Sequence, residues 1–178
     1  MEKIYQQKEK RMKKTKKHLF FWGGILSNWA EVPGGIKVVD EDRTIIFPTS
    51  EHLFMWFKAS CFSDLESMGK IELAKTPKEA KSIGRKVRNF DEGVWEEHRE
   101  EYMFKALRYK AESWPEFKEL VISTPQTFVE ASPYDKIWGI GLDENSPGVD
   151  NPDNWLGMNL LGNCLCNLRD YYGNESLD

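Results

Sequence analysis

The stretch PTSEHLFMWFKAS, residues 48–60, decides how the chain is expected to fold. Pro48 stops the strand that precedes it, and Thr49 or Ser50 is a good helix N-cap. A helix is therefore predicted to begin here and to run to about the end of the stretch. Glu51 lies in its first turn, where the helix dipole favours a negative charge.

The same helix carries a second charge, Lys58, seven positions after Glu51. Seven steps of 100° return to within about 20° of the start, so both charges lie on one face with Phe54 and Met55 between them. Each charge alone has a structural explanation, because Glu51 can cap the helix and the Lys58 stem can run along the core to water. Two opposite charges beside an apolar floor are costly in a closed core, so together they indicate a face that lines a cleft.

The rest of the chain predicts an α+β fold that is mostly helical, with a few short strands. The β-branched runs 36–39 and 44–47 predict a hairpin with a four-residue loop, Asp40 to Arg43. Thr76, followed by Pro77 and Glu79, is a second helix start. The other expected elements are strands near 19–22 and at 127–131, and helices at 64–74, 95–113, 116–123 and near the C-terminus.

The length of 178 residues suggests a single domain, with 40% hydrophobic and 30% charged residues. We predict a basic extension at residues 1–18, the domain at 19–172 and a tail at 173–178. Residues 1–17 hold eight Lys and Arg against two Glu, whereas the remainder is acidic. Such a basic arm can attract nucleic acid or an anionic surface through phosphate charge, or it is simply a solvated terminus or an exposed helical extension.

The three cysteines, Cys61, Cys164 and Cys166, form no Cys-x-x-Cys pair. Neither a disulfide framework nor a zinc site is expected, and the predicted setting is reducing and cytoplasmic. No segment approaches the roughly 20 apolar residues that span a bilayer, so no membrane association is expected. No metal or cofactor is predicted, because neither a ligand cluster nor a Gly-x-Gly-x-x-Gly turn occurs.

Two further clusters carry polar groups among aromatic residues. FVEASPYDKIWGIG, residues 128–141, is predicted to turn a corner at which a tryptophan offers a stacking face and two glycines let backbone amides approach a ligand. The alternative is an ordinary strand–loop corner. GGILSNW, residues 23–29, frames a serine and an asparagine with aromatic residues. The candidate residues of the two clusters are Glu130, Asp135, Trp138, Gly139 and Gly141, and Ser27, Asn28 and Trp29.

These segments, taken together, resemble the YbiA/NADAR family over about residues 19–172. The resemblance is carried by several blocks that come in order along the chain. The blocks are GG–SNW at 23–29, FPTSEH at 47–52, Lys58 with Ala59, ELAKTPKEAKSIGR at 72–85, Trp95, MFKALRYK at 103–110, FVEASPYDKIWGIG at 128–141, and WLGMNLLGNCL with Arg169.

The resemblance implies an N-glycosidase, a hydrolase that cleaves the C–N bond between a ribose and a base. One branch of the family acts on early riboflavin-pathway intermediates, and another removes ADP-ribose from modified guanine. Cleavage of this bond builds positive charge at the anomeric carbon, which a carboxylate stabilises and a lysine with a lowered pKa can attack.

The resemblance also assigns roles to particular residues. Lys58 matches the family lysine and is expected to be the nucleophile or Schiff-base former, with Glu51 shuttling protons. Asp135, the third catalytic candidate, is expected to orient the ribose hydroxyls. Either Glu51 or Asp135 could stabilise the positive charge or activate water. A tryptophan, Trp95 or Trp138, is expected to stack on the base. The remaining predicted substrate-binding residues are Arg85, which would meet a phosphate, and Ser27, Asn28, Trp29, Glu130, Gly139 and Gly141.

The chain departs from the family pattern at three places. Met55, Trp56 and Phe57 replace a stretch that often contains glutamines. Met158 stands where many members carry a basic residue, and Ile140 stands where riboflavin-linked members can be acidic. Ile140 points away from the riboflavin intermediates, and the missing cation at Met158 would weaken phosphate binding. The substrate stays open between a ribosylated small molecule and an ADP-ribosylated base.

Two other functions compete with the small-molecule N-glycosidase. One is an ADP-ribosyl hydrolase that acts on modified guanine in nucleic acid, which the basic N-terminal residues favour. The other is a non-catalytic module that binds ADP-ribose or NAD. It ranks last because the chain keeps both Glu51 and Lys58.

Overall fold

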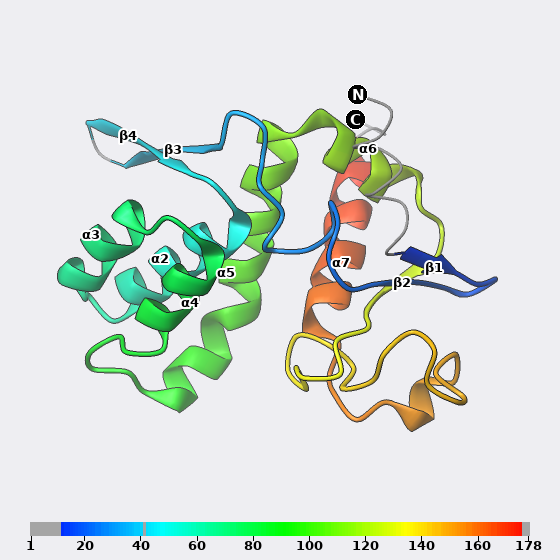
Figure 1. Cartoon of the computed structure of the whole chain (residues 1–178). Coiled ribbons are helices and arrows are strands. Elements are labelled where there is room, and N and C mark those ends of the chain that lie inside the picture. The colour runs from blue at the N-terminus through cyan, green and yellow to red at the C-terminus, as the bar shows by residue number, and fades with distance from the viewer. Residues whose placement is uncertain (1–11, 41, 176–178) are drawn as a thin grey trace. The chain divides into compact units, whose positions relative to one another are not determined.

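The computed structural model describes residues 12–40 and 42–175, which divide into two compact units. The first unit takes its described residues from both ends of the chain, up to Ser27 and from Glu119 onward. The second unit is the continuous segment Asn28–Lys118. The described chain holds six α-helices and five short strands (Figure 1), so the predicted α+β class, mostly helical, is confirmed.

The second unit is a β-hairpin followed by four helices. Strands β3 (Ile36–Asp40) and β4 (Arg43–Phe47) precede α2 (Ser50–Cys61), α3 (Leu65–Leu73), α4 (Pro77–Gly84) and α5 (Glu92–Ser113). Helix α2 contacts each of the other three helices, so it is the central element of this unit (Figure 1). The helix starts predicted at Thr49 and Thr76 are confirmed, whereas α5 begins three residues before Trp95.

The hairpin differs from its prediction in the length of its loop. The antiparallel ladder extends to the pair formed by Asp40 and Arg43, so the predicted four-residue loop is wrong. Arg43 explains the extension, because its guanidinium bonds Asp40 at 3.3 Å and Glu72 of α3 at 2.8 and 3.0 Å. The end of the hairpin is thereby fixed to α3. Two loop residues remain, Glu41 and Asp42, of which Glu41 lies outside the described residues.

Helix α2 begins and packs as its sequence dictates. Thr49 accepts a hydrogen bond from the His52 amide, and its Oγ1 lies 2.8 Å from His52 Nδ1. Residues 50–56 and Ala59 are buried, so both faces of the first two turns are covered by protein. Met55 and Trp56, in the stretch where the resemblance led us to expect glutamines, are therefore used for packing.

One glycine sets how closely α4 approaches α2. A methyl group added to Gly84, the last residue of α4, would collide with Met55 Sδ. The absence of a side chain at residue 84 lets the end of α4 lie directly on the buried thioether of α2. Arg85 follows Gly84 in the chain, so this contact also fixes the position of the Arg85 backbone.

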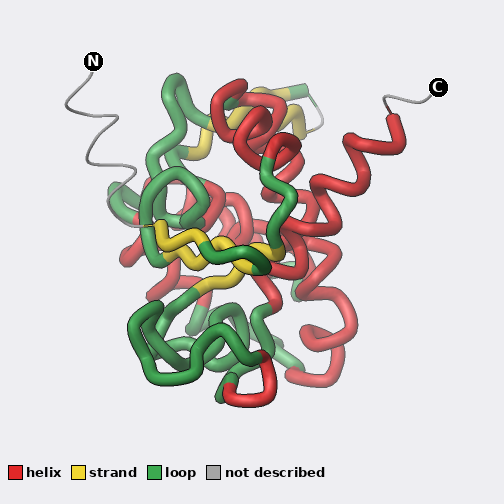
Figure 2. Tube along the Cα trace, turned by 90° about the vertical axis from the view of Figure 1, so that its right-hand side faces the viewer, coloured by secondary structure: helices red, strands yellow, loops and turns green. Residues whose placement is uncertain are grey.

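The first unit is built on a three-stranded sheet with the order β1-β2-β5. Strand β1 (Met12–Lys14) is antiparallel to β2 (His18–Phe21), and β5 (Thr127–Glu130) is parallel to β2. Helix α7 (Leu160–Glu175) contacts β5. A long loop, interrupted by the 3-10 turn η1 (Pro152–Asn154), joins β5 to α7 (green in Figure 2). Helix α6 (Pro115–Ser123) spans the boundary between the units.

The segment predicted as a basic extension is not uniformly an extension. Met12–Lys14 pairs with β2, and His18 already belongs to that strand. The basic residues of 1–11 lie outside the described residues. The domain boundaries at residues 18 and 172 stay predictions.

Replacing Gly84 with Ala tests the packing of α4 on α2. The added methyl group must displace Met55, and overpacking of this kind costs about 1–3 kcal/mol. The matched control is Gly69→Ala in α3, where the new methyl meets nothing within 4 Å and is expected to stabilise by about 0.5–1 kcal/mol. Urea unfolding measures both. Equal free energies of unfolding for the two variants would contradict the packing argument.

Candidate active site

The N-terminal end of α2 is held by Asn28, one of the predicted substrate-binding residues. The carbonyl oxygen of Asn28 accepts the Glu51 amide at 2.9 Å, and its side-chain oxygen accepts the Ser50 hydroxyl at 3.0 Å. Its side-chain nitrogen lies 3.2 Å from Met103 Sδ. Asn28 is only 7% exposed, so these contacts make it a residue that positions Glu51.

Glu51 is buried in the first turn of α2, with 5% of its surface exposed. A carboxylate at this depth is costly, and the positive end of the helix dipole offsets part of that cost. Glu51 and Lys58 lie two turns apart on α2, about 10 Å along its axis at 1.5 Å per residue. Phe54 and Met55, predicted to lie between them, are both buried.

Lys58 lies in the last turn of α2, partly buried against aromatic rings. Its amine nitrogen is 4.2 Å from the centre of the Phe90 ring and 5.3 Å from that of Trp95. Burial lowers the pKa of the Lys58 amine below its ordinary value, and the positive charge of Arg85 lowers it further. A larger share of this amine is therefore neutral near pH 7 than for a surface lysine, and a neutral amine is a nucleophile.

Trp95 is part of this aromatic wall, with only 9% of its surface exposed. Its ring lies 5.3 Å from Phe54 and stacks on Tyr102 at 6.1 Å. The ring is largely covered by these neighbours, so its observed role is to support the surroundings of Lys58. Stacking on a base stays a prediction for Trp95.

Two other predicted residues of this unit are exposed. Arg85 follows the end of α4, where its backbone amide bonds the Lys81 and Ile83 carbonyls. Trp29 is 44% exposed, and its ring lies 6.0 Å from the Lys81 amine. A solvent-exposed cation and an exposed flat ring are suited to a phosphate and to a planar group, respectively.

In the first unit, Asp135 forms the turn of the predicted tryptophan–glycine corner. Its Oδ1 accepts the amides of Ile137 at 2.9 Å and Trp138 at 2.8 Å. The Asp135 amide in turn donates to Ser132 Oγ at 3.2 Å. These bonds are those of an Asx turn, which supports the reading of this segment as a strand–loop corner.

The two glycines of the corner are required by the turn itself. The space beside Gly139 is bounded by the Glu130 and Asp135 carbonyl oxygens. Gly141 has a φ of +70°, and its amide donates to the Asp135 carbonyl at 3.1 Å. The Gly141 amide is thus bonded within the turn, and the assignment of Gly141 to substrate binding stays a prediction.

Asn159, which the sequence reasoning missed, joins this corner to β5 and α7. Its side chain accepts the Glu130 amide at 2.9 Å and donates to the Phe128 carbonyl at 2.9 Å. The Leu161 amide, in the first turn of α7, donates to the Trp138 carbonyl at 3.1 Å. Glu130 and Trp138 are therefore fixed by backbone bonds to one framework.

The structure brings the predicted residues together in two groups, one in each unit. The second unit holds Asn28 and Glu51 at one end of α2, and Lys58, Arg85 and Trp95 at its other end. The first unit holds the corner residues. Ser27 also belongs to the first unit, where its amide closes a turn onto the Gly24 carbonyl at 3.1 Å.

A family model for the NADAR domain matches residues 5–171. The chain belongs to the NADAR domain family. The predicted resemblance to YbiA and NADAR proteins is thereby confirmed.

Named relatives of this NADAR-domain protein include two N-glycosidases. N-glycosidase R617 of Acanthamoeba polyphaga mimivirus is 33% identical over 166 residues, which cover 88% of this chain and 96% of the relative. N-glycosidase YbiA of Shigella boydii is 34% identical over 148 residues, covering 83% and 80%. The enzyme class predicted from the sequence, a hydrolase of N-glycosyl bonds, is the class that both names give, and it is confirmed at that level.

The fold agrees with a solved relative. The NMR structure of E. coli YbiA superimposes with a TM-score of 0.70 at 26% identity, covering 96% of this chain and 94% of that one. Among the described residues, no helix is long and apolar enough to cross a membrane. Within residues 12–40 and 42–175, no group of three or more His, Cys, Asp or Glu is placed to hold a metal ion.

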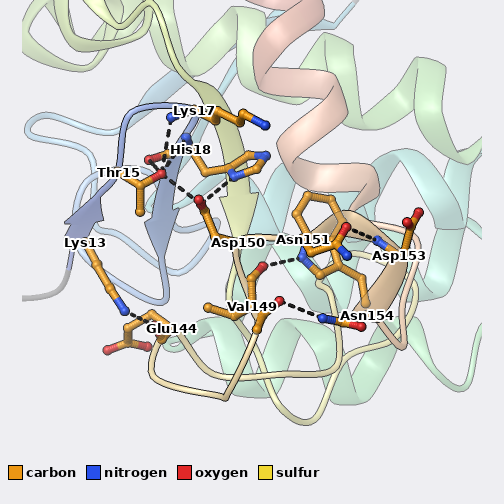
Figure 3. Close-up of polar contacts among 12 residues, drawn as sticks. Lys13, Thr15, Lys17, His18, Glu144, Val149, Asp150, Asn151, Asp153 and Asn154 are labelled. Carbon is orange, nitrogen blue, oxygen red and sulfur yellow. Dashed lines mark hydrogen bonds and ion pairs between the residues drawn. The ribbon is translucent and has the colours of Figure 1, made fainter.

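A polar cluster in the first unit of the NADAR-domain protein was also missed by the sequence reasoning (Figure 3). Asp150, in the loop before α7, accepts hydrogen bonds at Oδ1 from Thr15 Oγ1 and His18 Nδ1, both at 2.8 Å. Lys13 donates to the Glu144 carbonyl at 2.6 Å. Residues near the start of the chain thus fasten the loop 143–154 to β1 and β2.

The Asp150 bonds predict an acid-sensitive attachment of this loop. Hydrogen bonds from His18 and Thr15 lower the pKa of Asp150, so its contribution is present above its unfolded pKa. That contribution is lost as the pH falls through the folded value. Asp150→Ala is expected to speed amide hydrogen exchange in residues 143–154 at neutral pH.

The matched control is Asp153→Ala, an exposed carboxylate of the same loop (Figure 3). Mass spectrometry compares exchange in the two variants at each pH, which cancels the intrinsic pH dependence. The difference should shrink on acidification. Identical exchange in both variants at neutral pH would show that Asp150 does not hold the loop.

Proposed function

We propose that this NADAR-domain protein hydrolyses the C–N bond between a base and a ribose that carries a phosphate or belongs to ADP-ribose, with Lys58 as the nucleophile. The observation that supports this most is the setting of the Lys58 amine. It is partly buried against the Phe90 and Trp95 rings, and the charge of Arg85 acts on it. The named N-glycosidase relatives support the bond type.

The first step joins Lys58 to the sugar. The lone pair of the neutral amine attacks the anomeric carbon, and the C–N bond breaks with its electron pair going to the base nitrogen. That nitrogen takes a proton from the Glu51 carboxyl, and the attached amine returns one to the resulting carboxylate. The products are free base and a ribosyl-lysine.

The second step releases the sugar. The bond from the anomeric carbon to the ring oxygen opens, and the proton on the lysine nitrogen moves to that oxygen, which leaves an imine. Water adds to the imine carbon, and the carbon–nitrogen bond then breaks. Free Lys58 and ribose with its phosphate are released. Glu51, on the same helix, handles the protons of both steps.

The exposed residues of the second unit support a substrate with a phosphate and a planar group. Arg85 supplies a permanent cation with a planar fork of donors, and Trp29 supplies an exposed ring. The roles of Asp135 and Trp138 stay predictions, as does action on nucleic acid through the basic N-terminal residues.

Lys58→Ala is expected to abolish turnover, and borohydride should trap the wild-type imine. Without the amine no imine forms, so reduction during turnover should add the mass of the sugar to the Lys58 peptide only in wild type. Glu51→Gln is expected to lower kcat by roughly 10²–10⁴-fold, because the amide cannot transfer the proton.

Lys78→Ala is the matched control for this experiment, since Lys78 is an exposed lysine on α4. It should keep full activity and leave trapping unchanged. Circular dichroism verifies that each variant is folded. Full turnover by both Lys58→Ala and Glu51→Gln would end the assignment, and binding of ADP-ribose without product would indicate a sensor.

Arg85→Gln is expected to shift the pH dependence of kcat/KM to higher pH. Arg85 lowers the pKa of Lys58, so removing its charge raises that pKa and leaves less neutral amine at any given pH. Arg85→Lys keeps the positive charge, so the acidic limb of the pH profile of kcat/KM should stay at the same pH even if KM changes. An unmoved limb in Arg85→Gln would mean that Lys58 is not the titrating group.

A further inference from the structure

Two loops of the second unit lie at the Lys58 end of α2. The first follows α2 directly, and its Asp64 amide donates to the Ala59 carbonyl at 2.9 Å, next to Lys58. The second joins α4 to α5, and it carries Arg85 at its start and Phe90 near its end. Both residues of the second loop act on the Lys58 amine, through charge and through ring contact.

Asp64 ties these two loops together. The residue is 2% exposed, and its carboxylate accepts two hydrogen bonds from Ser67, at 3.2 Å from the amide and 2.7 Å from the hydroxyl. It accepts three more from Arg88, at 2.9 Å from the amide, 3.1 Å from Nε and 2.8 Å from Nη2. These bonds hold the pKa of Asp64 well below its usual range, so the carboxylate is charged throughout the working pH range.

The bonds to Arg88 exceed what the start of a helix requires. Capping α3 needs one side-chain oxygen on the Ser67 amide. The other hydrogen bonds that the Asp64 carboxylate accepts come from the Ser67 hydroxyl and from the backbone and side chain of Arg88. Because Arg88 lies between Arg85 and Phe90, fixing its backbone fixes both neighbours. The Phe90 ring also packs against Phe62 of the first loop, at 5.3 Å between ring centres.

We infer that Asp64 is a positioning residue for Lys58: it holds the α4–α5 loop so that Phe90 covers the Lys58 amine and Arg85 stays near it. The inference rests on the proposed function, in which Lys58 reacts. Asp64 itself is buried in its bonds to Ser67 and Arg88, so it acts through the loop that it holds.

The sign of the change in Asp64→Asn separates this role from a direct charge effect. A direct charge effect would lower the pKa of the amine, because removing a negative charge disfavours the protonated form. Releasing the loop instead exposes the amine to water and lets Arg85 move away, and both changes raise its pKa. The charged groups in this network are Asp64, Glu66, Lys70, Arg85 and Arg88.

The experiment follows the ¹³Cε signal of Lys58 against pH in lysine-labelled full-length protein, assigned with Lys58→Arg. Asp64→Asn is expected to move the midpoint toward that of an ordinary lysine, and to lower kcat/KM roughly 10- to 100-fold with an alkaline shift of its acid limb. Arg88→Lys keeps the positive charge but loses the forked contact, and should shift the midpoint less in the same direction.

Two controls complete the test. Glu66→Gln removes the exposed second partner of Arg88, at 3.3 Å, together with the exposed ion pair to Lys70, and should leave the midpoint unchanged. Ile71→Val weakens the same unit in its core and should lower Tm without moving the midpoint. If Asp64→Asn does not fold, Arg88→Lys decides.

If Asp64→Asn folds and Lys58 titrates with the same midpoint as in wild type, the inference is overturned. If only Arg88→Lys folds, an unchanged midpoint in that variant overturns it. The midpoint is read without substrate. A failure of the proposed function therefore shows up as activity that survives Lys58→Ala, whereas a failure of the positioning role shows up in the titration.

Discussion

The proposed chemistry depends on keeping a lysine amine partly out of water at the end of a buried helix. Withdrawing a charged amine from water is unfavourable, so burial increases the fraction of neutral amine. That fraction stays high only while the surrounding groups remain in place. Phe90, Trp95 and Arg85 provide these surroundings. None of them is on α2, so the lowered pKa of Lys58 depends on how two other segments, the α4–α5 loop and α5, pack around one helix end.

The two ends of α2 are fixed by different means. At the start, Asn28 and Thr49 accept hydrogen bonds from backbone amides of the first turn, which every helix leaves without an internal partner. Asn28 also accepts the Ser50 hydroxyl, and together these bonds fix the position of Glu51. At the end, aromatic packing and the Asp64–Arg88 contact take over. An acid anchored by local capping and an amine anchored by tertiary packing should differ in tolerance to substitution. Substitutions in the loop between α4 and α5 are expected to alter the surroundings of the Lys58 amine more than those of Glu51.

The sequence was informative wherever the deciding contacts are local. Thr49, Thr76 and the apolar run of α2 signal their helices within a few residues, and those helices form as predicted. The hairpin loop was misjudged because Arg43 extends the ladder through Glu72, 29 residues away. Phe90, Asp64 and the Asp150 cluster were missed for the same reason. Their partners are distant in sequence, and no spacing rule links them.

Met55 shows how the chain compensates for a departure from its family pattern. It stands in a stretch where the resemblance led us to expect glutamines, and it is buried against Gly84. A flexible thioether fills an irregular gap without needing hydrogen-bond partners, whereas a glutamine there would need them. Arg85 directly follows Gly84, so this apolar contact also fixes the backbone of the residue whose positive charge lowers the pKa of Lys58. The packing of Met55 on Gly84 thus supports the position of Arg85 through apolar contact.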